Sequence, residues 1–270
     1  MLIYYLIRYR RKVTATNLLH AFPDKSDKER KAIERSYYHH LCDLLTEGIF
    51  NLICSRGQIV RRYKFLNPEV VHQFYNQHKS VILLSAHYNN WEYMITSIGF
   101  RFYHNGVGVG KPLSNQHIAA YITQRRSRFG TEIVDQHNVR QVFQYYHDHN
   151  IPTAYLMLAD QSVNDVNKCV WTTFLNQETP FIYGPEYFAR KYDIPVVYYE
   201  VHKTRRHQYE ISFEVLCDQP SLTPQYSITK QYIGRLDKLL RQRPDYWLWT
   251  HKRWKRQRPE GMQLMTFNDK

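Results

Sequence analysis

Residues 80–94 read SVILLSAHYNNWEYM, an unbroken apolar run that leads directly into a histidine. A short apolar run bounded by polar residues is typical of a strand covered on both faces, as in a parallel sheet. His87 and, five residues later, Glu92 therefore stand where such a strand leaves the core. Because sites in open α/β sheets form at the carboxyl ends of strands, this position predicts a site at the rim of the sheet.

The rest of the chain alternates apolar strands with helices. Ser26 followed by Glu29 is a capping-box pattern and predicts the start of a long N-terminal helix that reaches about residue 50. The pattern predicts further strands at 106–110, 131–135, 153–160, 194–201 and 209–216, and further helices at 90–103, 114–130, 138–149, 183–192 and 223–242.

Together these elements predict an α/β fold with a mainly parallel central sheet flanked by helices. We expect a single domain over residues 1–270, with an N-terminal helical segment at 1–50 and the α/β core that carries the site at 80–258. The pair 194–201 and 209–216 should add an antiparallel edge to the sheet.

The composition favours anionic partners. With 37 Lys and Arg against 24 Asp and Glu, the formal charge is +13, which attracts nucleic acid, acidic proteins or anionic lipid headgroups. The four cysteines are scattered with no C-x-x-C pair, so we expect reduced thiols in a cytosolic setting and no zinc site. No other metal spacing and no glycine-rich phosphate loop occurs, so neither a metal nor a cofactor is expected.

The amino terminus is the most apolar end of the chain. MLIYYLIRYRRKV has only seven residues before Arg8, which is too short to span a bilayer, and it lacks a small-residue cleavage site. It fits the cytosolic end of a longer hydrophobic segment.

His87 and Glu92 have the chemistry of a base and its partner. A histidine takes a proton near neutral pH, and a nearby carboxylate can fix its tautomer and stabilise the imidazolium. Such a pair can deprotonate a hydroxyl that attacks an acyl carbonyl, and without a G-x-S-x-G sequence a mechanism with no acyl-enzyme is simpler. The alternative is a histidine bonded to a backbone carbonyl and a glutamate on a solvated helix.

Four more residues are candidates for substrate binding. Arg125, Arg126 and Arg128 end a predicted helix, where they either clamp a substrate phosphate or complement the helix dipole. Asp160 ends an apolar strand, and a buried acid there needs a partner. We expect it to support the site, with a simple turn cap as the alternative.

The stretch 241–258, RQRPDYWLWTHKRWKRQR, interleaves seven basic residues with aromatic ones. This composition favours contact with anionic lipid or lipid phosphate. Binding of single-stranded nucleic acid and simple core packing of the tryptophans are the alternatives. His251 is expected to pack or to form hydrogen bonds, and not to act as a second base.

Five segments in order resemble the bacterial lipid A biosynthesis lauroyl/myristoyl (late) acyltransferases. HYNNWE (87–92) is similar to the H-x4-D/E motif of glycerolipid-type acyltransferases, and DYWLWTHKRWKRQRPEG (245–261) to the family's carboxyl-terminal motif. The others are YRRKVTATNLLHAFPDKS (9–26), RRSRFG (125–130) and LADQSVND (158–165).

The resemblance implies a glycerol-3-phosphate acyltransferase-like fold and acyl transfer from acyl carrier protein, or acyl-CoA, to a hydroxyl of a lipid A precursor. By its motif, His87 would be the general base and Glu92 its partner. The reaction would take place at the cytoplasmic face of the cell inner membrane, on an anionic surface, with nucleic acid not expected as a partner. Members commonly carry an amino-terminal membrane helix, which the resemblance implies is absent or clipped here.

Two alternatives remain open. The acceptor could be another lipid, such as a glycerophospholipid or an amino-acid lipid. Less in keeping with the ordered motifs, the chain could be a non-catalytic basic protein that binds membranes or nucleic acid.

Overall fold

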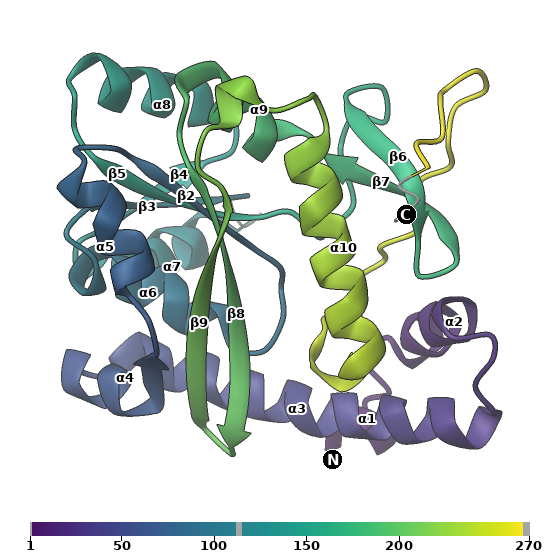
Figure 1. The fold of residues 1–270 in the computed structure, drawn as a ribbon. Helices are drawn as coiled ribbons and strands as arrows, with labels where there is room; N and C mark the ends of the chain where they lie inside the picture. Colours follow the sequence, from purple (N-terminus) through teal and green to yellow (C-terminus); the bar gives the residue numbers. More distant parts are fainter. Residues whose placement is uncertain (1, 112–114, 267–270) are drawn as a thin grey trace.

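A seven-stranded sheet forms the centre of the protein, which is known from a computed structural model that describes residues 2–111 and 115–266 (Figure 1). Its order is β1 (Tyr63–Phe65), β9 (Gln208–Cys217), β8 (Val196–Arg205), β2 (Val81–Ser85), β5 (Thr153–Leu158), β3 (Asn105–Gly110) and β4 (Thr131–Asp135). All neighbours are parallel except β8 and β9. The predicted α/β class with a mainly parallel sheet is confirmed.

Strand β2 shows why the apolar run at 80–86 organises the fold. All five of its residues are buried, and their side chains alternate between two hydrophobic cores. Ile82 and Leu84 enter one core, while Val81 and Leu83 enter the other. A strand with two buried faces needs a layer on each side of the sheet.

Helices supply both layers. On the face of Val81, the core is completed by α4 (Arg56–Arg62), α5 (Glu69–Asn76) and α6 (Trp91–Arg101). On the face of Ile82, it is completed by α2 (Arg11–Ala21), α3 (Asp27–Ile53), α8 (Val139–Asp148), α9 (Gly184–Tyr192) and α10 (Ser227–Gln242). The helix α3 runs along the bottom of the molecule in Figure 1 and begins with the predicted capping box of Ser26 and Glu29.

Two further helices contact α3, and the shorter of them also adds the buried Tyr4 to the core on the face of Ile82. The short helix α1 (Leu2–Tyr5) contacts α3, and α7 (Gln116–Ser127) contacts α3, α6 and β4 without burying any residue of its own. Asn115 caps α7 by accepting a hydrogen bond from the Ile118 amide, while Ser114, at which the sequence predicted this helix to begin, lies outside the described residues. Within 2–111 and 115–266, no helix combines the length and apolar character needed to cross a bilayer.

The structure differs from the predicted sheet at two places. The pair β8 and β9 is antiparallel as expected, but it is not the edge, because the three-residue strand β1 pairs in parallel beyond β9. A separate hairpin of β6 (Cys169–Phe174) and β7 (Gln177–Ile182) was not predicted. Its turn uses Leu175 and Asn176 at positive φ, a conformation for which leucine gives no sequence signal.

The contact between α6 and the start of β4 depends on two glycines. A Cβ atom built on Gly99 would lie 2.3 Å from the backbone carbon of Gly130, and Gly130 itself has a φ of +97°. The backbones therefore meet with no room for a side chain.

We expect Gly99→Ala to lower the free energy of unfolding by about 1–3 kcal/mol, because helix α6 must move away from the backbone of residue 130. Urea denaturation measures the change. The matched control is Gly234→Ala in α10, where nothing lies within 4 Å of the new methyl group and helix propensity should instead add roughly 0.5–1 kcal/mol. Equal effects of the two substitutions would contradict the close approach.

Candidate active site

His87 and Asp160 meet at the carboxyl edge of the sheet. Strands β2 and β5 are parallel neighbours in which Ser85 pairs with Leu158, so each residue follows its strand by the same two positions. The two side chains are joined by a hydrogen bond of 2.7 Å between Nδ1 of His87 and Oδ1 of Asp160. The predicted positions at the strand ends thus bring these residues together.

The second oxygen of Asp160 is held by the carboxyl-terminal segment. The indole Nε1 of Trp247 donates to Oδ2 at 2.7 Å, and the Asp160 side chain is only 2% exposed. Burial alone would raise the pKa of Asp160, but the His87 imidazole and the indole N–H outweigh it and hold that pKa below its usual value. The carboxylate is therefore ionised and fully bonded.

The contact with Asp160 sets the chemistry of the His87 ring. A carboxylate only accepts hydrogen bonds, so Nδ1 of His87 is the donor and the neutral ring carries its lone pair on Nε2. The side chain is 19% exposed, and the ring of Trp91 stands edge-on to it with centroids 5.1 Å apart. A partly open imidazole with a free Nε2 and a buried carboxylate behind it can act as a general base.

Two asparagines shape the turn between His87 and α6. Asn89 adopts the left-handed conformation (φ 52°), and its side chain donates to the carbonyl of Val201 at 2.6 Å. Asn90 caps α6 through the Tyr93 amide and donates to the buried carboxylate of Glu47 at 2.6 Å. These contacts tie the turn to β8 and to α3.

Glu92 does not contact the histidine in the way the sequence predicted. Its carboxylate accepts two hydrogen bonds from Arg126, of 2.6 Å to Nη2 and 3.0 Å to Nε. Glu92 lies on the first turn of α6, which carries it toward α7, whereas Asp160 leaves the strand next to His87. Asp160 occupies the partner position that the sequence had assigned to Glu92.

Arg125 and Arg128 cap the carboxyl-terminal end of α3. Arg125 donates to the carbonyl of Leu52, and Arg128 donates to the carbonyl of Asn51 at 2.6 Å and to that of Cys54 at 3.0 Å. The last carbonyls of a helix lack internal partners and carry partial negative charge, which guanidinium groups satisfy. Both side chains also line the cavity described next. Their role in substrate binding stays a prediction.

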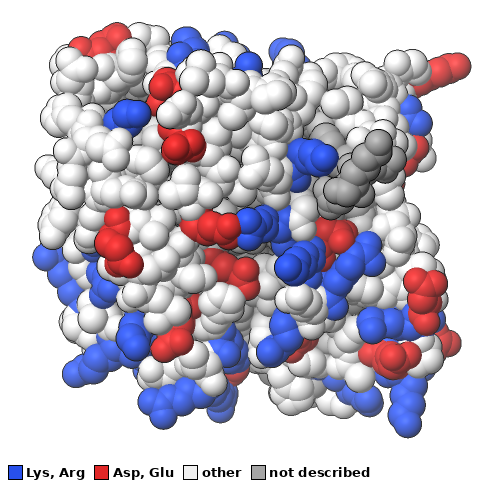
Figure 2. Space-filling model, viewed as in Figure 1, with Lys and Arg blue, Asp and Glu red and all other residues white. Residues whose placement is uncertain are grey.

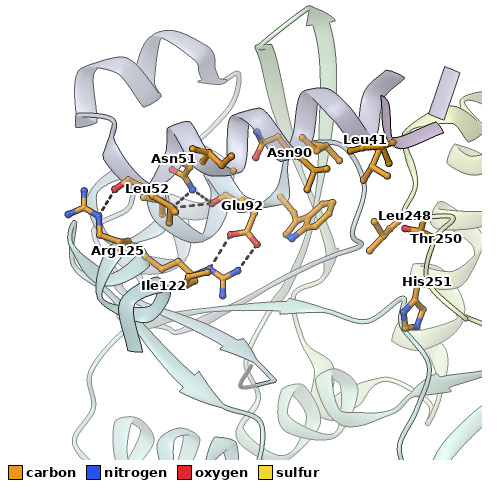
Figure 3. Close-up of a pocket in the computed structure, with 18 of the residues that line it drawn as sticks. Leu41, Asn51, Leu52, Asn90, Glu92, Ile122, Arg125, Leu248, Thr250 and His251 are labelled. Carbon is orange, nitrogen blue, oxygen red and sulfur yellow. Dashed lines mark hydrogen bonds and ion pairs between the residues drawn. The ribbon is translucent and has the colours of Figure 1, made fainter. Parts of the chain in front are cut away.

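A cavity of about 730 Å³ opens beside Trp91 (Figure 3). Its walls come from α1, α3, α6, α7 and the carboxyl-terminal segment, and most are apolar. In Figure 3, Glu92 and Arg125 lie on one side of this cavity, while Leu248, Thr250 and His251 lie on the other. Arg10 and the three arginines of 125–128 add positive charge, so the cavity suits an apolar chain attached to an anionic group.

His251 is fixed at the cavity wall. Its Nε2 accepts a hydrogen bond of 3.1 Å from the Ser162 amide, and burial lowers its pKa to about 4. The ring is therefore neutral at physiological pH and carries its proton on Nδ1. This agrees with the expected hydrogen-bonding role and makes His251 an available donor.

The stretch 241–258 is more buried than its composition suggested. Trp247 and Trp249 are 2% and 0% exposed, and the half-buried Trp254 donates to Thr179 at 2.7 Å. Arg253 is buried too, with Nη2 donating to the Pro180 carbonyl and its guanidinium lying over the Phe181 ring. Lipid contact by Trp247 and Trp249 is thus wrong, and the alternative of core packing holds for them.

Trp247 is the site residue that sequence reasoning missed. A backbone bridge pairs it with Tyr88, and the Asn89 amide donates to the carbonyl of Tyr246 at 3.0 Å. These contacts lay the carboxyl-terminal segment beside the turn after His87. The only sequence signal was a tryptophan that needs a hydrogen-bond partner when buried.

The chain matches the family model described as bacterial lipid A biosynthesis acyltransferase over residues 1–256. A search of curated proteins found no match for it.

The lowered pKa of Asp160 makes a prediction about stability. The pKa of Asp160 in the folded state lies below the usual 3.8, so its ionised form stabilises the fold at pH values above 3.8. This contribution to stability is lost as the pH falls through the folded-state pKa. Asp160→Asn removes this titration. We expect the wild type to be more stable than Asp160→Asn at pH 7. The difference between their urea midpoints should narrow as the pH falls below about 5. A difference that stays constant with pH would show that Asp160 is not ionised in the fold.

Proposed function

Because the chain belongs to the family of bacterial lipid A biosynthesis acyltransferases, we propose that it moves a fatty acyl group from the thioester of acyl carrier protein to a hydroxyl of a lipid A precursor. Membership of this family makes the chain an acyltransferase. The observation that carries the finer proposal is the His87–Asp160 pair, with its free Nε2, beside an apolar cavity rimmed by arginines.

The proposed reaction needs one proton carrier and no covalent enzyme intermediate. Nε2 of His87 removes the proton of the acceptor hydroxyl as its oxygen attacks the thioester carbonyl. The tetrahedral intermediate then collapses, the carbon–sulfur bond breaks, and the imidazolium returns the proton to the leaving thiolate. Asp160 keeps the ring oriented and stabilises the imidazolium between these two steps.

The cavity and its arginines bind the substrates in this proposal. The apolar walls take a fatty acyl chain, and a guanidinium matches the oxygens of a phosphate in a bidentate way. Arg126 is the leading candidate for the phosphate contact because Glu92 holds it at the cavity wall. Glu92 is then a positioning residue for Arg126. Arg125 and Arg128 would both bind substrate and cap the carboxyl-terminal end of α3.

A basic surface favours the acidic carrier protein as donor. Figure 2 shows Lys and Arg side chains gathered over the lower part of the view, where α3 and the β8–β9 turn lie. Exposed members include Lys28, Lys31, Arg35, Arg205 and Arg206. Such a surface also suits the cytoplasmic face of the inner membrane, which we propose as the location.

We propose His251 as a donor to the oxyanion that forms during attack. Asp160 hydrogen-bonds to the ring of His87, and the Ser162 amide hydrogen-bonds to the ring of His251. The short segment from 160 to 162 therefore positions both histidines. The neutral His251 ring presents Nδ1–H, and a fixed donor in a partly dry cavity stabilises a developing negative charge.

The base is tested with His87→Ala. We expect acyl transfer to fall by roughly 10²–10⁴-fold, because the hydroxyl proton has no acceptor. Purified protein is incubated with acyl carrier protein thioester and lipid A precursor, and products are followed by mass spectrometry. Glycerophospholipid and acyl-CoA in parallel reactions identify the acceptor and the donor. The matched control is His147→Ala on α8, which should retain full activity. Near-normal transfer by His87→Ala would defeat the mechanism.

The oxyanion role is tested with His251→Ala and His251→Gln. Loss of the donor should lower kcat by roughly 10²–10³-fold with little change in KM, because the interaction forms only in the transition state. Glutamine keeps an N–H donor and should recover part of the lost kcat. If both variants lose activity equally while their thermal stability also falls equally, His251 is only structural.

A further inference from the structure

Helix α3 buries a carboxylate that the proposed mechanism does not use. The side chain of Glu47 is only 1% exposed, although it lies on the half of α3 that borders the cavity. Burying an ionised group is costly unless hydrogen bonds replace its water, and apolar side chains of similar volume often stabilise such a place as well or better. The presence of an acid there therefore needs a reason beyond packing.

Hydrogen-bond partners from two other parts of the chain surround this carboxylate. From the ribbon of β8 and β9, the Tyr209 hydroxyl donates to Oε2 at 2.8 Å, and Nδ1 of His207 lies 2.7 Å from Oε1. From the turn before α6, the side-chain amide of Asn90 donates to Oε2 at 2.6 Å. Burial and the Glu47 charge raise the pKa of Tyr209, so its hydroxyl keeps its proton and remains a donor. An ionised carboxylate, which only accepts, satisfies all three partners at once.

Asn90 connects this carboxylate to the active site. It caps α6 with its side-chain oxygen, which accepts from the Tyr93 amide at 3.0 Å, while its side-chain nitrogen donates to Glu47. Glu47 thus fixes which way the amide faces, because a reversed amide would turn its oxygen toward the carboxylate. Asn90 stands in the chain between His87 and Trp91, whose rings pack edge-on, so its orientation bears directly on the turn that carries the histidine.

A second residue of α3 holds the same end of α6. Asn51 is buried and donates to the carbonyl of Glu92 at 3.2 Å (Figure 3) and to the hydroxyl of Thr96 at 2.8 Å. Because residues four apart lie on one face of a helix, Glu47 and Asn51 reach α6 from the same side of α3. Their contacts fall on the cap and the first turns of α6, the part that carries Trp91 and Glu92.

We propose that Glu47 is a positioning residue for acyl transfer, which acts through Asn90 to hold residues 87–92 in the geometry that the reaction needs. Asn51 supports the same segment from one turn further along α3. A displacement of about 1 Å at a reacting group can lower a rate by roughly 10²-fold, so a rigidly held turn has a catalytic use that fold stability alone does not supply. The role in acyl transfer rests on the proposed function, whereas the fixed position of the turn does not.

Three variants separate positioning from folding. Glu47→Met has a similar volume and removes both acceptor oxygens, whereas Glu47→Gln removes the charge but keeps one carbonyl that can accept from Asn90. The matched control is Asp43→Leu, which removes an acid one turn earlier in α3 that pairs with Lys203 at 2.8 Å and Arg206 at 2.9 Å on the same ribbon. Thermal unfolding verifies that each variant is folded. Glu47→Asp, which keeps the charge but falls one methylene short of Asn90, replaces Glu47→Met if that variant does not fold.

The kinetic readout is acyl transfer with the thioester and lipid substrates described above. We expect Glu47→Met to lower kcat by roughly 10–10²-fold and to change KM less than about threefold, because the turn loses its hold while the cavity keeps its walls. Glu47→Gln should recover most of this loss. Asp43→Leu should keep kcat within about threefold of the wild type, even though it loses stability with its ion pairs. A Glu47→Met enzyme within that same range, or an equal fall in Asp43→Leu, overturns the proposal.

A double-mutant cycle tests whether Glu47 acts through Asn90. The variant Glu47→Met/Asn90→Ala should have about the same kcat as Asn90→Ala alone, because the carboxylate has no further effect on the turn once its amide partner is gone. Losses that multiply in the double variant would show independent effects and also overturn the proposal.

Fluorine NMR keeps this result apart from the proposed function. The protein is labelled with 5-fluorotryptophan, and the Trp91 resonance is assigned from its absence in Trp91→Phe. We expect this resonance to shift or broaden in Glu47→Met and to stay unchanged in Asp43→Leu, whether or not acyl transfer is detected. An unchanged Trp91 resonance in Glu47→Met defeats the positioning role. A wild type that transfers no acyl group, with the resonance shifted in Glu47→Met, counts against the proposed function and leaves the hold of Glu47 on the turn supported.

Discussion

The structure depends on one buried carboxylate. Asp160 is almost completely inaccessible, and an ionised group in that position costs several kcal/mol unless hydrogen bonds replace its water. Its two oxygens are each bonded at 2.7 Å, to His87 and to Trp247. These residues come from the ends of two strands and from the carboxyl-terminal segment, so the carboxylate joins three distant parts of the chain and fixes the histidine ring between them.

Two acidic residues near the sheet edge have different partners. Asp160 is buried and hydrogen-bonds to the imidazole of His87, while Glu92 lines the cavity and hydrogen-bonds to Arg126. In the proposed mechanism Asp160 stabilises an imidazolium and Glu92 positions a guanidinium for a phosphate, two roles that a single carboxylate could not fill. Burial suits the proposed role of Asp160 because charge interactions are stronger away from water, and the partial exposure of Glu92 suits its proposed place beside a substrate.

Helix α3 links the chemistry to the surface. Its inner side packs on the core through Tyr37 and Leu41. Its second half forms a wall of the cavity and also carries the exposed row of Leu45, Ile49 and Ile53. Arg125 and Arg128 on the neighbouring α7 segment donate hydrogen bonds to its last carbonyls. The cavity and the exposed row therefore share one rigid element.

The α/β class, the long capped helix at 26–50 and the positions of His87 and Asp160 at strand ends could all be predicted from the sequence alone. These follow from hydrophobic periodicity and local capping, which act between near neighbours in the chain. Which carboxylate bonds to His87 could not be predicted, because that depends on β2 and β5 lying side by side in the folded chain. The same holds for Trp247 as a hydrogen-bond donor in the core, since burial is a property of the packed chain and no local pattern encodes it.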